Sequence, residues 1–172
     1  MTCFNAGLFY TPKMRYTSDI MAILQLTLNP EPILRKTIAE VTDIADEELQ
    51  RLVSDMRVTM VAAQGIGLAA NQVGQDLRIF TIDKTLAEKA GISDVFINPA
   101  IEHISEKMSS MEEGCLSVPG KFSDVRRSAE ITVSALDEKG VRFTVKATGL
   151  LARVLQHEID HLNGMLFIDK ME

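Results

Sequence analysis

The residues with the clearest chemical potential are His157-Glu158-Ile159-Asp160-His161, close to the end of the 172-residue chain. Residues four apart on a helix lie one turn above each other, so the two imidazoles face the same way. Two such nitrogens can chelate one divalent metal, and Glu158 lies beside them to transfer protons. The alternative is a helix with two surface histidines. We favour the metal-binding helix, because burying two histidines and two acids in this apolar segment without a role would be costly.

A third metal ligand is expected upstream of this helix, because a catalytic site normally has three protein ligands plus water. Phe167 stands where one protease family with this motif has a third histidine. The soft candidates are Cys3, His103 and Cys115. His103 is interpreted as an exposed strand residue, and Cys3 lies in a segment without periodicity. Cys115 follows a glycine that allows close backbone approach, and Pro119-Gly120 after it predict a turn. A buried structural cysteine is the alternative for Cys115.

A third stretch, residues 65–72 (GIGLAANQ), combines two glycines with small residues before a polar amide. One interpretation is a helix end and a tight turn. The functional interpretation is an exposed backbone with which a peptide can pair, with Gln72 as a hydrogen-bond donor near the metal. The stretch is not a dinucleotide-binding fingerprint, because it lacks the third glycine and follows a helix.

The elements that must position these residues predict an α+β fold. Leu49, Leu52, Val53, Met56 and Met60 have the spacing of an amphipathic helix over residues 45–63, and glycine is expected to adopt the left-handed conformation at its end. A second helix is predicted from residue 149 to residue 163. Between them, strands are predicted at 77–82, 95–101, 131–136 and 141–145, the last two joined by a turn at 137–140. Strands in the middle with helices at either end favour α+β over an alternating parallel fold.

The composition excludes several classes of protein. The net charge of -6 disfavours a broad nucleic-acid surface, and the pair Arg126–Arg127 is interpreted as a solvated strand start. The apolar stretches are too short to span a membrane, for which about 20 apolar residues are needed. Two cysteines give no disulfide framework, so a cytoplasmic protein is expected.

The N-terminal residues 1–20 show neither helix nor strand periodicity, and they have no secretory signal. At Met21 the sequence changes to an apolar run. We expect an N-terminal extension or arm at 1–20 and a single catalytic domain at 21–172. Met21 as the natural start and a loosely held arm both remain open.

Three segments together resemble the signature motifs of peptide deformylases: G-x-G-L-A-A-x-Q at Gly65–Gln72, E-G-C-L-S at Glu113–Ser117, and Q-H-E-x-D-H at Gln156–His161. The resemblance covers about residues 21–170. It implies antiparallel sheets packed around a central helix that carries H-E-x-x-H, with an N-terminal amphipathic helix. It also implies removal of the formyl group from the N-terminal formyl-methionine of nascent polypeptides, and transient contact with the ribosome.

The resemblance implies a role for each matching residue. Cys115, His157 and His161 would be the metal ligands, and Glu158 the general acid/base. The metal would be Fe²⁺ in the cell, with Zn²⁺ or Ni²⁺ in purified protein. Iron(II) and zinc both suit a site of one thiolate and two imidazoles.

The other roles concern the substrate. Gln72 and the backbone N–H of Leu116 would donate to the oxyanion, and Gly67 would bind the substrate main chain. Asn71 fills a variable position of the first motif, and its side chain is expected to alter the rim of the pocket.

The apolar side chains of Met111, Leu150 and Val154 are predicted to form the methionine pocket. Gln156 and Asp160 are predicted to orient the metal ligands. Two rival functions are weighed against this one. A zinc endopeptidase lacks its downstream third ligand here, and a structural metal module or degenerate binding protein would normally have a fourth Cys or His and no use for Glu158.

Overall fold

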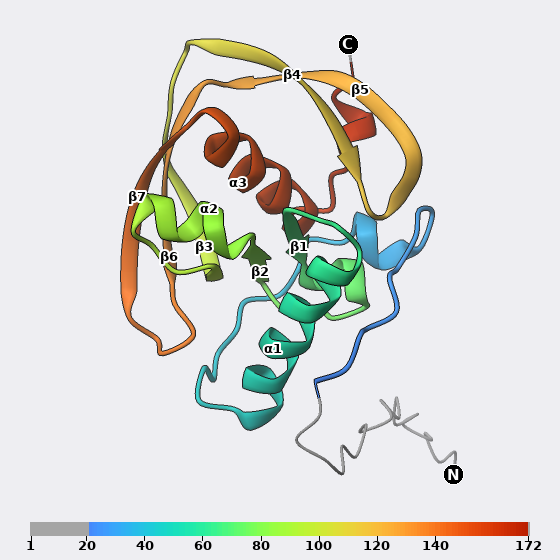
Figure 1. Ribbon diagram of the computed structural model, residues 1–172, viewed down its shortest axis with the longest axis vertical. Helices are drawn as coiled ribbons and strands as arrows, with labels where there is room; N and C mark the ends of the chain where they lie inside the picture. The colour runs from blue at the N-terminus through green and yellow to red at the C-terminus, as the bar shows by residue number, and fades with distance from the viewer. Residues whose placement is uncertain (1–20, 172) are drawn as a thin grey trace, which may run out of the picture.

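The computed structural model describes residues 21–171, and the extension expected at residues 1–20 lies outside the described residues. In this part of the chain, short helices and antiparallel strands form an α+β fold, as predicted from the sequence (Figure 1). The helices are α1 (Glu47–Ala62), α2 (Lys84–Ala90) and α3 (Gly149–Leu162), with 3-10 turns η1 (Pro32–Arg35), η2 (Ala70–Val73) and η3 (Phe167–Asp169). No helix within residues 21–171 is long and apolar enough to cross a membrane.

The strands form two antiparallel sheets. The larger sheet has the order β1-β2-β3-β6-β7, with β1 (Gly67–Ala69), β2 (Ile79–Ile82), β3 (Val95–Ile104), β6 (Glu130–Leu136) and β7 (Arg142–Thr148). The smaller sheet is the hairpin of β4 (Met108–Cys115) and β5 (Val118–Ser128). The two are continuous at one end, because the Ser105 amide donates to Glu130 O (3.0 Å) and the Ala129 amide donates to Lys107 O (2.7 Å). Helix α3 contacts both sheets.

Helix α1 begins where the sequence predicts and ends differently. The Asp46 side chain accepts a hydrogen bond from the Glu48 amide (2.9 Å), which satisfies one of the free amides of the first turn. The end of the helix corrects the sequence expectation, because Gln64 and not a glycine adopts the left-handed conformation (φ 57°). Gly65 instead allows close packing, because a Cβ there would lie 2.9 Å from Leu116 Cδ1.

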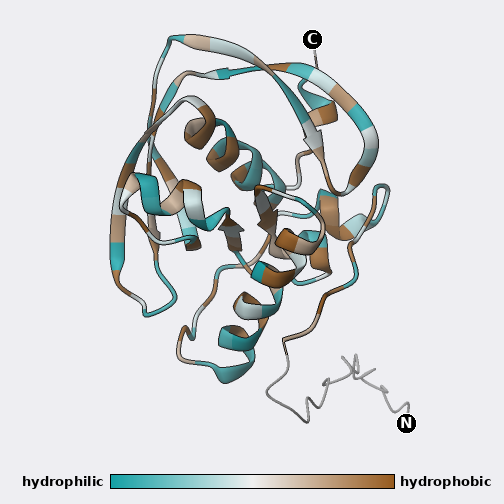
Figure 2. Ribbon diagram, viewed as in Figure 1, coloured by the Kyte–Doolittle hydropathy of each residue, from teal (hydrophilic) through white to brown (hydrophobic). Residues whose placement is uncertain are grey.

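Helix α3 is buried along most of its length. Its first half is hydrophobic and its second half is polar (Figure 2). Leu151, Leu155 and Leu162 pack into the main core, where the rings of Phe80 and Phe96 stack with centroids 4.6 Å apart. The core packing of these leucines therefore holds the polar second half of α3, which includes His157 and His161, in place.

The predicted strands correspond to β2, β3, β6 and β7, with the turn at 137–140 between the last two. The β4–β5 hairpin was not predicted, and the turn expected at Pro119-Gly120 is wrong because both residues lie inside β5. The chain reverses at Leu116-Ser117 instead. Most of β4 is exposed, so its sequence lacks the apolar alternation of a half-buried strand.

Replacing Gly164 by alanine tests the end of α3. Gly164 has a φ of 74°, and a Cβ there would lie 2.6 Å from the backbone oxygen of Arg35. We expect Gly164→Ala to lower the free energy of unfolding by about 3 kcal/mol or more, because backbone strain and a backbone collision combine. Urea denaturation measures the loss.

Gly91→Ala is the matched control, because Gly91 has a φ of 67° and nothing within 4 Å of an added Cβ. It should cost about 1–2 kcal/mol, the strain alone. Equal losses in the two variants would show that the segment at Arg35 moves aside without cost, contrary to the packing described.

Candidate metal centre

One thiol and two imidazoles converge beneath the β4–β5 hairpin. Cys115 is the last residue of β4, and His157 and His161 lie one turn apart on α3. Their ligand atoms all lie within 4.8 Å of one another, and Cys115 Sγ is 3.2 Å from His161 Nε2. His161 is fully buried, and the other two residues are partly buried. A thiolate with two imidazoles is a donor set for zinc or iron(II), and the three donors are close enough to share one ion.

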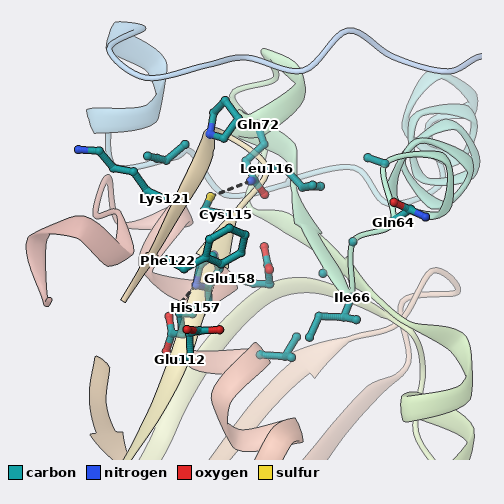
Figure 3. Close-up of a pocket in the computed structure, with 18 of the residues that line it drawn as sticks. Gln64, Ile66, Gln72, Glu112, Cys115, Leu116, Lys121, Phe122, His157 and Glu158 are labelled. Carbon is teal, nitrogen blue, oxygen red and sulfur yellow. Dashed lines mark hydrogen bonds and ion pairs between the residues drawn. The ribbon is translucent and has the colours of Figure 1, made fainter. Parts of the chain in front are cut away.

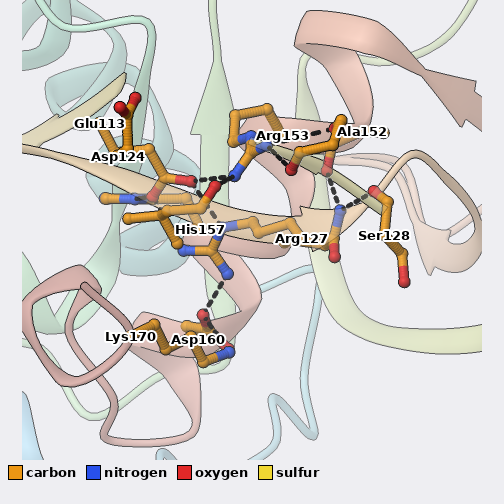
Figure 4. A network of polar contacts seen from close by, with 12 residues as sticks. Glu113, Asp124, Arg127, Ser128, Ala152, Arg153, His157, Asp160 and Lys170 are labelled. Atoms are coloured by element: carbon orange, nitrogen blue, oxygen red, sulfur yellow. Dashed lines mark hydrogen bonds and ion pairs between the residues drawn. The ribbon is translucent and has the colours of Figure 1, made fainter. Parts of the chain in front are cut away.

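The carboxylate of Glu113 orients His157 (Figure 4). Its Oε2 lies 2.9 Å from His157 Nδ1, and it accepts hydrogen bonds from Arg127 (2.6 and 2.9 Å) and Arg153 (2.8 Å). Burial alone would raise the pKa of Glu113, but hydrogen bonds from the two arginines and His157 hold that pKa well below its usual value. An ionised partner on Nδ1 leaves Nε2 of His157 for a metal, as is common among metal-binding histidines.

Arg127 extends this network to Asp160, and its position corrects an expectation. Its guanidinium donates to Asp160 Oδ2 (2.5 Å), which also pairs with Lys170 (2.7 Å). The Arg126–Arg127 pair was interpreted as solvated, yet the side chain of Arg127 is only 3% exposed. Neighbouring residues of a strand point to opposite faces, so Arg126 faces solvent and Arg127 faces α3. Asp160 is therefore connected to His157 through Arg127 and Glu113.

Arg153 ties α3 to both strands of the hairpin. It lies one turn before His157, and its buried guanidinium donates to Val125 O (2.6 Å) on β5 and Ser109 O (2.8 Å) on β4. The same guanidinium contacts Glu113. The position of the hairpin, and hence of Cys115, is fixed relative to the helix by this side chain.

Gln72 and Asn71 on η2 approach the cluster from the other side. The Gln72 amide nitrogen lies 3.5 Å from Cys115 Sγ and 3.2 Å from Ser117 Oγ, and its oxygen accepts from the Ala69 amide (2.8 Å). Asn71 was expected at the pocket rim, and this is wrong. It is fully buried and donates to the backbone oxygen of His161 (2.6 Å), because η2 packs against α3.

The carboxylate of Glu158 rests against the backbone of β1. A Cβ on Gly67 would lie 2.8 Å from Glu158 Cδ, so a side chain at this position would have to displace the Glu158 carboxylate. Burial raises the pKa of Glu158 to about 7. Its Oε2 is buried and has no hydrogen-bond partner among the described residues. This carboxylate oxygen is therefore free to exchange a proton with a bound ligand.

A cavity of about 710 Å³ opens beside these residues (Figure 3). Gln64 and Ile66 line one side, and Lys121 and Phe122 line the other. The three residues predicted to bind methionine all line this cavity; Val154 is buried, and Met111 and Leu150 are more exposed. The other predicted site residues in its lining are Gly67, Gln72, Cys115, Leu116, His157 and Glu158.

The family model of polypeptide deformylases matches residues 23–172. The chain belongs to the polypeptide deformylase family. A peptide deformylase of Rhizobium meliloti (strain 1021) is 48% identical over 149 residues, which are 87% of this chain and 85% of that protein.

Solved deformylase structures have the same fold. The one from Ehrlichia chaffeensis in complex with actinonin has a TM-score of 0.81 and 40% identity, and the match covers 88% of this chain and 90% of that one. The class I type b enzyme from Acinetobacter baumannii, with Met-Ala-Ser bound, has a TM-score of 0.80 and 32% identity, covering 88% of this chain and all of that one. The predicted deformylase family is thus confirmed.

Three residues of this deformylase site had no predicted role: Glu113, Arg127 and Arg153. One signal was available for Arg153, because it is a charged residue inside the otherwise apolar run from Leu150 to Leu155. Gln156 was predicted to orient the ligands. Its amide donates instead to Ser128 O (3.0 Å) and Ala152 O (2.9 Å), so it holds β5 against α3.

Replacing Glu113 by glutamine tests the support of His157. We expect Glu113→Gln to weaken zinc or cobalt(II) binding by about 10–100-fold, because His157 loses its ionised partner and two buried arginines lose theirs. Competition with a chromophoric chelator measures the affinity.

Glu112→Gln is the control, since Glu112 is the exposed neighbour on the opposite face of β4. It should leave metal affinity unchanged. If both variants bound metal as tightly as the unsubstituted protein, the support assigned to Glu113 would be wrong.

Proposed function

We propose that this protein hydrolyses the formyl group from the N-terminal formyl-methionine of nascent polypeptides, releasing formate and a free amine. The observation that carries the proposal is the convergence of Cys115, His157 and His161 beside Glu158, at a cavity, in a chain of the deformylase family. We assign this activity to residues 21–172 as the catalytic domain, built around α3 and its H-E-x-x-H segment.

Cys115, His157 and His161 would hold one divalent metal, Fe²⁺ in the cell and Zn²⁺ or Ni²⁺ in purified protein. When bound, the metal would supply a Lewis acid that lowers the pKa of a water molecule. The protein residues supply the remaining steps. The Glu113–His157 contact and the Gln72–Cys115 contact support this ligand assignment, because each orients a donor from behind.

Glu158 is assigned as the base and then the acid. It takes a proton from the attacking water and passes it to the departing amine, so that the formyl C–N bond breaks and formate leaves. Its buried carboxylate, its unpartnered oxygen and a pKa raised by burial to about 7 support a group that exchanges protons near neutral pH.

Gln72 and the backbone N–H of Leu116 are assigned to the oxyanion that develops on the formyl oxygen. Donors placed in advance where charge appears stabilise the transition state without reorganising. The side chain of Gln72 is held at its oxygen by the Ala69 amide, which directs the NH₂ group toward Cys115 and supports the assignment.

Gly67 is assigned to the substrate main chain. It begins β1, the edge strand of the larger sheet, and an edge strand offers backbone groups to an added peptide strand. Met111, Leu150 and Val154 are assigned to the methionine side chain. The Met-Ala-Ser bound to the Acinetobacter baumannii relative supports a methionine-first peptide as the ligand of this cavity.

Nascent chains with a formylated methionine are therefore the proposed partners, met in the cytoplasm during transient contact with the ribosome. The ribosome contact rests on the chemistry of the substrate, because formylated termini first appear on chains under synthesis.

Formate release tests the reaction and its base together. We expect protein purified anaerobically with Fe²⁺ to release formate from formyl-Met-Ala-Ser. Glu158→Ala should lower kcat by at least about 100-fold, because proton transfer is lost while the metal ligands remain. Metal content is measured on both proteins. A fully metallated protein that releases no formate would overturn the proposal and favour a peptidase or a degenerate module.

Leu150→Arg tests the methionine pocket without burying a charge in the core, because Leu150 is 47% exposed at the cavity. We expect kcat/KM for the formyl-Met peptide to fall by about 10–100-fold as the apolar wall gains a charge. Val141→Arg, at an exposed residue outside the cavity lining, is the control and should leave kcat/KM unchanged. Equal kcat/KM in both variants would show that the assignment of Leu150 to the methionine pocket is wrong.

A further inference from the structure

The first described residues are bound to α1 by two buried side chains. The Ala22 amide nitrogen donates to Asp55 Oδ1 (2.7 Å), and the Leu24 amide nitrogen donates to Thr59 Oγ1 (2.8 Å). Asp55 and Thr59 lie one helical turn apart, and each is only 1% exposed. The backbone nitrogen of Ala22, near the start of this segment, is therefore hydrogen-bonded to a buried carboxylate.

A buried carboxylate needs more than one neutral donor. Removing an ionised carboxyl group from water costs several kcal/mol unless an opposite charge or several hydrogen bonds compensate. Among the ion pairs recorded for residues 21–171, none includes Asp55. A peptide amide at Ala22 offers one N–H and no net charge, whereas an α-ammonium at the same nitrogen offers three N–H donors and a full positive charge.

We propose that the functional chain begins at Ala22, whose α-ammonium forms a partly buried ion pair with the buried carboxylate of Asp55. Three other observations agree. Met21 is 60% exposed, so the residue before Ala22 lies at the surface. Ala22 is small, which suits removal of a preceding methionine. The deformylase family model begins its match at residue 23.

The step that creates this terminus is hydrolysis of the Met21–Ala22 amide. Water supplies OH to the carbonyl carbon of Met21 and hydrogen to the nitrogen of Ala22, which is protonated at neutral pH. One route is translation from Met21 followed by excision of that methionine. The other route is proteolysis of the longer chain. Both give the same Ala22 ammonium, so the ion pair is the shared chemistry.

The ion pair is tested by comparing three forms of the protein that differ at one nitrogen. The first starts at Ala22, released from a cleavable fusion partner, and the second is the same chain with an acetylated Ala22. The third is the full chain of 172 residues. Asp55→Asn is made in each form, and urea denaturation gives the unfolding equilibrium constant. Thr59→Ala is the matched control, because its contact with Leu24 is the same in all forms.

At pH 6.5 we expect Asp55→Asn to raise the unfolding constant at least tenfold more in the Ala22 form than in the other two. The α-amino pKa should be raised by Asp55 above its unfolded value of about 7.7–8. Its stabilisation is then fully present below that unfolded value and is lost as the pH rises through the folded pKa. The excess should therefore disappear at high pH. An equal effect of Asp55→Asn in all three forms would overturn the proposal.

The cell provides an independent test that does not depend on formate release. Intact mass of the protein from cells that express its full gene should correspond to a chain starting at Ala22. Met21→Leu then distinguishes the routes: loss of the Ala22 form indicates initiation at Met21, and its persistence indicates proteolysis. Retention of residues 1–21 in the mature protein would overturn the proposal, whatever its activity.

Discussion

The site depends on the interactions of one buried carboxylate, that of Glu113. It lies between two guanidinium groups and against the imidazole of His157, and an unpaired charge at this depth would cost several kcal/mol. Arg127 and Arg153 offset that cost, and Arg127 is itself balanced by Asp160. One carboxylate thus joins β4, β5 and α3, and it also selects the nitrogen that His157 presents to a metal.

This network explains how a mostly exposed hairpin carries a metal ligand. An isolated two-stranded sheet is marginally stable, and the hydrophobic cluster next to the β4–β5 hairpin is small, with Leu34, Val118, Val125, Leu166 and Phe167 as its buried members. Arg153 supplies what apolar packing does not, because its hydrogen bonds reach the backbone of both strands. The distance from Cys115 to α3 is therefore set mainly by polar contacts.

The sequence was informative where local pattern and structure coincide. The periodic apolar residues of α1 and α3 predict both helices, and the β-branched runs predict β2, β3, β6 and β7. The β4–β5 hairpin, the burial of Arg127 and the inward position of Asn71 depend on partners far away in the chain. Nothing in the Arg126–Arg127 pair states which arginine will face α3; strand pairing decides it.

The three sequence motifs also form one physical unit. Asn71 of the first motif holds the backbone of His161 in the third, and Gln72 contacts Cys115 of the second. Glu113 of the second motif holds His157 of the third. At Gly67 the contact is so close that a side chain would displace Glu158. Because each motif fixes atoms of the others, a substitution in one motif moves the reactive groups of the other two. The three motifs therefore occur together because of their packing as much as because of their chemistry.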